Sequence, residues 1–129
     1  MGIAFTRMKT LIVAVLALAA LAAGPGSASA APVRHCGNYG IPEGSSGTKP
    51  VFTRDDIAGA GVYGIRTRVA RCRTARRMVR RFWNGSWGDC DPGCRRGRFR
   101  CVNRQTGDEV WIMRCTAAGG RVVRFEYGA

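Results

Sequence analysis

Residues 72–83 carry the sequence CRTARRMVRRFW, which has the periodicity of an amphipathic helix. At about 100° per residue, its apolar side chains fall within an arc of about 140° and its arginines fill the opposite arc. Asn84-Gly85 follows and predicts the end of the helix. The expected buried arc comprises Cys72, Ala75, Met78, Val79, Phe82 and Trp83, and the expected exposed arc comprises Arg73, Arg76, Arg77, Arg80 and Arg81.

Alternating apolar and polar residues on both sides of this helix predict β-strands. Gly107 and Gly119-Gly120 separate the downstream strands and suit turns. The predicted fold is therefore α+β, with one amphipathic helix packed on a three- to four-stranded antiparallel sheet stapled by disulfides. The expected strands are 62–69, 98–104, 110–116 and 121–127.

The first thirty residues have the three parts of a secretory signal peptide. Arg7 and Lys9 form the positive region, Leu11 to Ala23 is apolar, and Ala28-Ser29-Ala30 predicts cleavage after Ala30. Met8 is an alternative start. A second long apolar run does not occur, so we expect a secreted chain without a transmembrane segment after cleavage. The expected organisation is a signal peptide (1–30), a Gly/Ser/Pro-rich loop segment (31–61) and a small α+β domain (62–129).

Six cysteines in so short an exported chain predict a disulfide framework. The turn sequence Asp91-Pro92-Gly93 favours Cys90–Cys94, and two inward-facing strand positions favour Cys101–Cys115, which leaves Cys36–Cys72. The second pair requires a loop from Thr106 to Val110. A rival scheme links Cys72 to Cys115 and Cys36 to Cys101. No Cys-x-x-Cys pair occurs, so neither a metal nor another cofactor is expected.

Charge is the strongest indication of function. The formal net charge is +13, or +11 after removal of Arg7 and Lys9. An excess of this size favours an anionic partner, although a GC-rich genome would also explain the preference for arginine over lysine. Only Asp89 and Asp91 oppose nine arginines between residues 73 and 100. The candidate anion-binding residues are Arg73, Arg76, Arg77, Arg80, Arg81, Arg95, Arg96, Arg98 and Arg100.

No constellation of catalytic residues is recognisable. His35 is the sole histidine, and the neighbouring carboxylates of Asp55-Asp56 would point to opposite faces of an extended chain. Trp87 is the one tryptophan expected on the surface. No motif of sequence-specific nucleic-acid recognition occurs.

Residues 64–77, with the sequence GIRTRVARCRTARR, carry a resemblance to a known group. Together with Cys36-Gly37 and the later Cys101 and Cys115 segments, they resemble small secreted arginine-rich actinobacterial domains of unknown function. In that group a Cys-x-x-Ala-Arg helix precedes a Cys-containing β-meander. The resemblance implies a compartment and a fold, but no site. The tryptophan-containing loop with Cys90 and Cys94 departs from it.

These observations favour a secreted, basic, non-catalytic domain that binds an anionic partner, which could be a wall polymer, a nucleic acid or an acidic protein. The alternative is a protein inhibitor or toxin-like interaction module that uses residues 86–97. A cryptic hydrolase is the third possibility. The sequence does not predict the oligomeric state.

Overall fold

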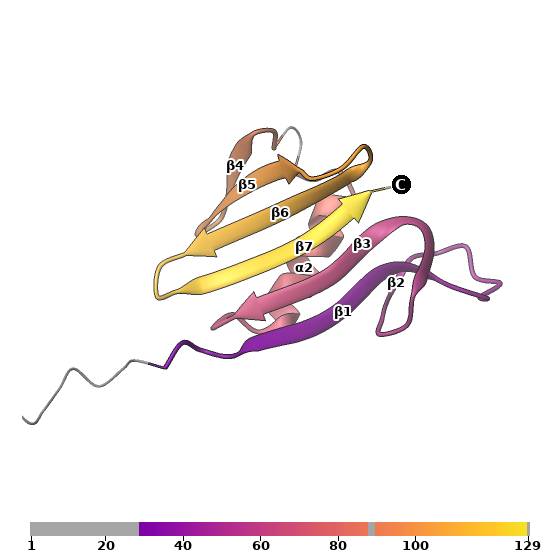
Figure 1. Ribbon diagram of the computed structural model, residues 1–129, viewed down its shortest axis with the longest axis horizontal. Helices are drawn as coiled ribbons and strands as arrows, with labels where there is room; N and C mark the ends of the chain where they lie inside the picture. Colours follow the sequence, from indigo (N-terminus) through magenta and orange to yellow (C-terminus); the bar gives the residue numbers. More distant parts are fainter. Residues whose placement is uncertain (1–28, 88–89, 129) are drawn as a thin grey trace, which may run out of the picture. The chain divides into compact units, whose positions relative to one another are not determined.

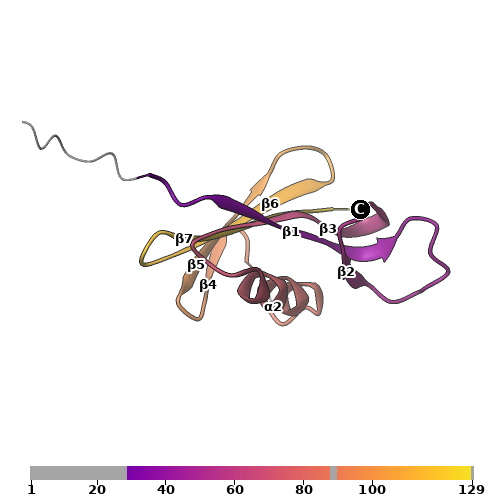
Figure 2. The same ribbon diagram turned by 90° about the horizontal axis from the view of Figure 1, so that it is seen from below.

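An antiparallel sheet of seven strands, covered on one face by a helix, forms the framework of the described part of the protein (Figures 1 and 2). This computed structural model describes residues 29–87 and 90–128. The strand order is β2-β1-β3-β7-β6-β5-β4. The elements are β1 (Val33–Pro42), β2 (Val51–Thr53), β3 (Ile57–Arg68), α2 (Cys72–Trp83), β4 (Gly93–Arg96), β5 (Phe99–Gln105), β6 (Val110–Ala117) and β7 (Arg121–Gly128).

The predicted α+β class is confirmed, but the expected three to four strands are too few. Ala31–Ala129 forms one compact unit. The predicted signal peptide lies outside the described residues, apart from its last two positions. No helix in the described part of the chain is long and apolar enough to cross a membrane.

The expectation of a loop over residues 31–61 is wrong, because β1, β2 and the start of β3 lie there. β1 buries Cys36 and Tyr39 and pairs with β3 along its length. Gly37 has a φ of +90°, and a Cβ at this position would collide with the backbone oxygen of Thr53. Glycine in this segment therefore allows close approach of neighbouring strands, rather than marking a loop.

A second correction concerns the tryptophan-containing loop that the sequence predicts around Cys90 and Cys94. Residues 93–96 form β4, and Cys94 lies opposite Cys101 of β5. A Cβ at Gly93 would lie 2.9 Å from the Cys101 backbone oxygen. The glycine that suggested a turn is therefore also a point of close strand contact.

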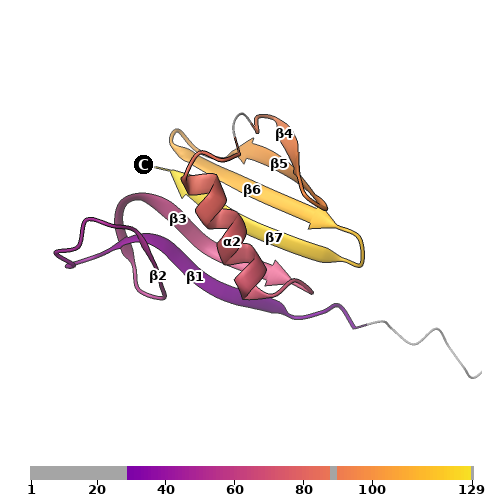
Figure 3. The ribbon, with the colours of Figure 1, turned by 180° about the vertical axis from the view of Figure 1, so that it is seen from behind.

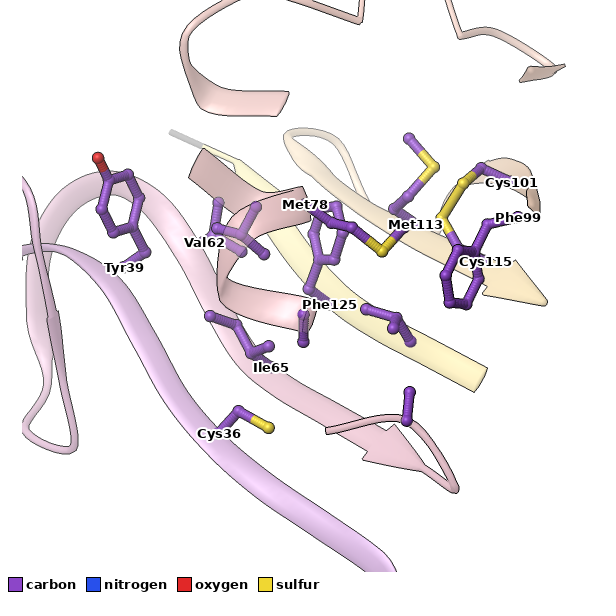
Figure 4. Packing of buried hydrophobic residues seen from close by; sticks show 14 of the residues in the cluster. Cys36, Tyr39, Val62, Ile65, Met78, Phe99, Cys101, Met113, Cys115 and Phe125 are labelled. Atoms are coloured by element: carbon purple, nitrogen blue, oxygen red, sulfur yellow. A yellow bond between two sulfur atoms is a disulfide. The ribbon is translucent and has the colours of Figure 1, made fainter. Parts of the chain in front are cut away.

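Helix α2 packs its apolar face on the middle of the sheet (Figure 3). Ala75, Met78 and Val79 are buried, as predicted, and the arginines of the opposite arc are exposed. Figure 4 shows Ile65, Met113 and Phe125 projecting from the sheet into this core, where all three are completely buried.

Two tryptophans differ from expectation. Helical periodicity predicts that Trp83 lies on the buried arc, but it is 36% exposed, whereas Trp87, expected on the surface, is only 4% exposed. The Trp87 ring packs edge-on against Phe82, with a centroid separation of 5.5 Å. Trp87 follows the end of the helix in sequence, so helical periodicity does not predict its burial. Its ring is nevertheless buried against Phe82 of the helix.

The disulfides are Cys36–Cys72, Cys90–Cys94 and Cys101–Cys115, in agreement with the predicted pairing and not with its rival. Cys101 and Cys115 lie directly opposite each other on β5 and β6. The longer loop that this register requires is present, since the Thr106 N–H donates to the Val110 carbonyl oxygen at 2.9 Å. Cys36–Cys72 joins β1 to the first residue of α2.

Val69 makes the reversal between β3 and α2 with an unfavourable backbone. Its φ is +62°, and the Ala70 N–H donates to the Arg68 carbonyl oxygen at 2.7 Å across it. This is the pattern of the rare γ-turn, in which a β-branched residue is strained. The Val69 side chain is 48% exposed, so its removal gives up little buried surface.

We expect Val69→Gly to stabilise the protein by about 0.5–1 kcal/mol, because relief of strain outweighs the entropy that glycine adds to the unfolded chain. For a domain of this size the melting temperature should rise by several degrees, or about 4–8 °C for each kcal/mol. Thermal unfolding followed by circular dichroism measures the change. Val102→Gly is a matched control, because Val102 is 53% exposed within a regular strand, and it should be destabilising. A lower melting temperature for Val69→Gly would contradict the proposed strain.

Candidate anion-binding surface

The outer face of α2 presents five exposed arginines: Arg73, Arg76, Arg77, Arg80 and Arg81. Their spacing follows from the helical repeat, since residues three and four apart share a face. Arg80 and Arg81 lie in the last turn, where a positive charge interacts favourably with the helix dipole. None of these five arginines forms a salt bridge within the described part of the chain.

Two of the five arginines are held in place by contacts with the N-terminal strands. The Arg76 Nε and Nη2 groups donate to the Cys36 carbonyl oxygen at 3.2 and 3.1 Å. The guanidinium groups of Arg76 and Arg80 also lie over the Phe52 ring, 5.5 and 5.4 Å from its centroid. Arg76 therefore fastens α2 to β1, and Phe52 orients both cations.

A depression of about 560 Å³ lies on the side of α2 that faces β2. Phe52 is the aromatic residue that lines it, together with Asn84 and the five helix arginines. Nearby, Tyr39 contacts both Phe52 and Trp83, with ring centroids 4.5 and 6.2 Å apart. Arginine and partly exposed aromatic side chains are thus combined along this edge of the helix.

A second depression, of about 430 Å³, lies between α2 and the β4–β5 turn. Arg77 and Arg81 line it from the helix, and Arg96 and Arg98 line it from the turn. Arg96 lies 5.6 Å from the centroid of the buried Trp87 ring, and its Nη1 donates to the Arg95 carbonyl oxygen at 2.9 Å. The Arg96 Nε is buried and has no hydrogen-bond partner among the described residues.

Seven of the nine predicted arginines are therefore on the helix side of the sheet, and two are not. Arg95 and Arg100 are opposite each other on β4 and β5, and Arg100 lies between the inward-facing Phe99 and Cys101. Their side chains must point to the other face, because orientation alternates along a strand. We call the remaining seven the helix surface: Arg73, Arg76, Arg77, Arg80, Arg81, Arg96 and Arg98.

Phe52, which contacts two arginines of the helix surface, was not singled out by the sequence. It lies well before the first helix arginine in the chain and reaches the surface because β2 pairs with β1 at Tyr39↔Phe52. An isolated aromatic residue in a Gly/Ser/Pro-rich segment could have indicated that this segment packs against the rest of the protein, because solvated loops contain few aromatic residues.

Asp55 and Tyr127 are two titratable groups whose surroundings the structure describes. The Thr53 hydroxyl donates to the Asp55 carboxylate at 3.1 Å within a turn. Burial raises the pKa of the Tyr127 hydroxyl, the side-chain hydrogen bond with Asn103 lowers it, and the negative charge of Asp91 raises it. Tyr127 therefore stays protonated at neutral pH. In the described residues, no group of three or more His, Cys, Asp or Glu side chains is arranged to hold a metal ion.

Comparison with known proteins gives no further assignment. No protein-family model matches the chain, and no curated protein or solved structure is significantly similar to it.

Proposed function

We propose that this protein is a secreted, non-catalytic domain that binds an anionic polymer carrying phosphate groups, and that the helix surface is its binding site. The observation that carries the proposal is the depression lined by Arg77, Arg81, Arg96 and Arg98. Four arginines line it, and no acidic side chain is found among its described lining residues.

Arginine chemistry supports phosphate as the recognised group. A guanidinium presents paired N–H donors that match phosphate oxygens, and it binds anions in water with little dehydration cost. The buried Arg96 Nε lacks a partner within the described residues, and an unpaired buried donor is unfavourable. Because this Nε is inaccessible to solvent, a phosphate in the depression would instead be bound by the exposed Arg77, Arg81 and Arg98.

Preorganisation supports the same proposal. Arg76, Arg80 and Arg96 are already held over aromatic rings or by backbone hydrogen bonds. Ordering a long side chain on binding costs about 0.5–1.5 kcal/mol, so arginines that are ordered beforehand bind more tightly. The site has few neutral hydrogen-bonding side chains, which favours recognition of the polymer backbone rather than of a base sequence.

The expected export of the chain supports an extracellular partner. Three disulfides form and persist in oxidising compartments. They agree with the predicted signal peptide and with the resemblance to secreted actinobacterial domains.

Changing Arg73, Arg77 and Arg81 together to glutamine is expected to weaken binding and its dependence on salt. None of the three donates a side-chain hydrogen bond or lies over an aromatic ring in the described structure, so the fold should be unaffected. The logarithm of affinity should fall less steeply with the logarithm of salt concentration, by about 0.7 for each phosphate of a single strand that the variant no longer neutralises. Fluorescence anisotropy with a labelled oligothymidylate of about 20 nucleotides measures this slope.

A variant with Arg34, Lys49 and Arg54 changed to glutamine controls for net charge. These exposed residues lie in or near the N-terminal strands, and their replacement removes the same three charges. The control variant should keep most of the salt dependence of binding. If both variants showed the same reduction in slope, binding would reflect total charge and not the helix surface. If the helix variant instead captured a secreted protease one-to-one as tightly as the unaltered protein, the inhibitor alternative would be favoured.

A further inference from the structure

The face of the sheet that α2 leaves uncovered is also basic. Figure 1 shows this face toward the viewer, with α2 behind the strands. Its arginines alternate with completely or largely buried residues, as Arg66 does between Ile65 and Thr67. We call this set the open-face arginines: Arg66, Arg68, Arg95, Arg100, Arg104, Arg114 and Arg124.

Three of these arginines form a row across three neighbouring strands. Arg114 of β6 is directly opposite Arg124 of β7, and Arg124 is directly opposite Arg66 of β3. Side chains in directly opposed positions share a face and are about 5 Å apart at Cβ. Like charges in such positions repel and destabilise the sheet. A row of three cations is therefore an unfavourable arrangement unless an anion neutralises it.

The chain itself neutralises little of this charge. Glu126 is the one acidic residue in the seven strands, and its carboxylate pairs with Arg124 at 3.2 Å. Arg66 and Arg114, on either side of Arg124, form no salt bridge among the described residues. The row thus presents two cations without a salt-bridge partner among the described residues, on either side of one partly exposed ion pair.

The same row lies where two depressions meet. One, of about 430 Å³, extends toward Arg104 and Val102, and the other, of about 320 Å³, extends toward Arg68 and Val122. Arg114 and Arg124 line both depressions. The two depressions therefore adjoin at Arg114 and Arg124, and each is also lined by a further arginine, Arg104 in one and Arg66 and Arg68 in the other.

We infer that the open-face arginines are a second binding surface for a phosphate-bearing polymer, so that one molecule of this protein bridges two polymer chains. The helix surface and the open face lie on opposite sides of the sheet (Figure 2). One short polymer segment therefore cannot easily contact both surfaces. The bridging rests on the proposed function of the helix surface, whereas binding at the open face does not.

The composition of the open face favours a polymer over a membrane surface. Aromatic residues, above all tryptophan and tyrosine, anchor proteins at bilayer interfaces. Phe99, Trp111 and Phe125 belong instead to the helix side, since each alternates with open-face residues. Tyr63, opposite Glu126, does lie on the open face, but its hydroxyl donates to the Gly59 carbonyl oxygen within the protein. The exposed apolar residues between the arginines are single valines, such as Val102 and Val33.

The experiment measures bridging directly. Streptavidin beads carry biotinylated oligothymidylate of about 20 nucleotides, and oxidised protein is added, followed by a fluorescent oligothymidylate of the same length. Capture of fluorescence reports molecules that hold two strands. The open-face variant is Arg66→Gln, Arg68→Gln and Arg114→Gln, which leaves the Arg124–Glu126 pair in place. The helix variant (Arg73, Arg77 and Arg81 to Gln) and the charge control (Arg34, Lys49 and Arg54 to Gln) are the comparisons.

We expect the open-face variant to lose bridging by about tenfold or more, while its affinity for one strand falls no more than about threefold. The charge control should bridge nearly as well as the unaltered protein. The open-face variant should also melt at an unchanged or higher temperature at low salt, because its substitutions remove like-charge repulsion.

Each contrary outcome has a distinct meaning. Unchanged bridging by the open-face variant would overturn the second surface but leave the helix surface intact, and it would point to bridging by a dimer. If the helix variant alone kept full one-strand affinity while the open-face variant lost it, the open face would stand and the proposed function of the helix surface would fail. Loss of binding to phosphatidylglycerol vesicles by the open-face variant, with no bridging of oligothymidylate by any protein, would assign this face to a membrane and overturn the inference.

Discussion

Changing Val79 to aspartate is expected to unfold this protein at room temperature. Val79 is completely buried between α2 and the sheet, in a core that includes Ile65 and Phe125. An unpaired carboxylate there loses its hydration, and the change also removes the burial of the valine side chain, which is worth about 1.5–3 kcal/mol. The combined cost of several kcal/mol approaches the entire stability of a small domain, about 5–15 kcal/mol.

Two control variants separate burial from the chemistry of the substitution. Arg77→Asp places aspartate on the exposed arc of the same helix and should change the free energy of unfolding by no more than about 0.5 kcal/mol. Val102→Asp makes the same replacement as Val79→Asp at a position that is 53% exposed. It should cost about 1 kcal/mol at most, since neighbouring arginines offset the poor strand preference of aspartate.

Urea unfolding followed by near-ultraviolet circular dichroism measures all three proteins. We expect Arg77→Asp to be the most stable of the three variants and Val102→Asp to be less stable. Val79→Asp should show no cooperative unfolding transition. A folded Val79→Asp protein, or equal damage from Val79→Asp and Arg77→Asp, would contradict the buried face assigned to α2.

The sequence predicts the helix and the C-terminal strands because their patterns are local. In residues 72–83 the apolar residues repeat with the helical period, and the burial of Ala75, Met78 and Val79 follows directly. In β5, β6 and β7 strict alternation marks the inward positions, and Met113 and Phe125 are indeed completely buried. The Cys101–Cys115 disulfide could be predicted for the same reason, because the two residues lie on one face of a hairpin.

Strands β1, β2 and β4 could not be predicted because their evidence is not local. β1 contains Gly37 and Gly40, which resemble loop residues until the neighbouring backbone and Ile57 are seen to occupy the space of a side chain. β2 has three residues and depends on pairing with β1. In each case the partner strand supplies the stability, so composition alone points to a loop.

The division of the arginines into two surfaces required the register. Arg96 and Arg100 are four residues apart in sequence, yet a turn and the alternation of two strands place them on opposite faces. The Arg114–Arg124–Arg66 row combines residues from three strands, one of them on the other side of α2 in the chain. A charge count identifies an excess of cations, but only strand pairing shows which cations adjoin.

The second large effect is expected from the Cys36–Cys72 disulfide. It closes the longest loop of the three, with a sequence separation of 36, against 4 for Cys90–Cys94. In the chain-entropy model the stabilisation grows with loop length, to about 4 kcal/mol for the longer loop and about 2 kcal/mol for the shorter. Replacing both cysteines of a pair by alanine should therefore destabilise the Cys36–Cys72 variant by about 2 kcal/mol more.

The position of Cys36–Cys72 adds to this difference. The bond fixes the start of α2 to β1 beside the Arg76 hydrogen bonds to the Cys36 carbonyl oxygen. Its loss loosens the N-terminal strand and the helix surface together, whereas loss of Cys90–Cys94 acts on the short connection before β4. Urea denaturation of both double variants, with non-reducing peptide mapping of the parent protein, tests the argument. A Cys72–Cys115 linked peptide would refute the pairing itself. Equal destabilisation by the two double variants would show that loop length does not govern their effects, and that the structure already joins β1 to α2 without the covalent bond.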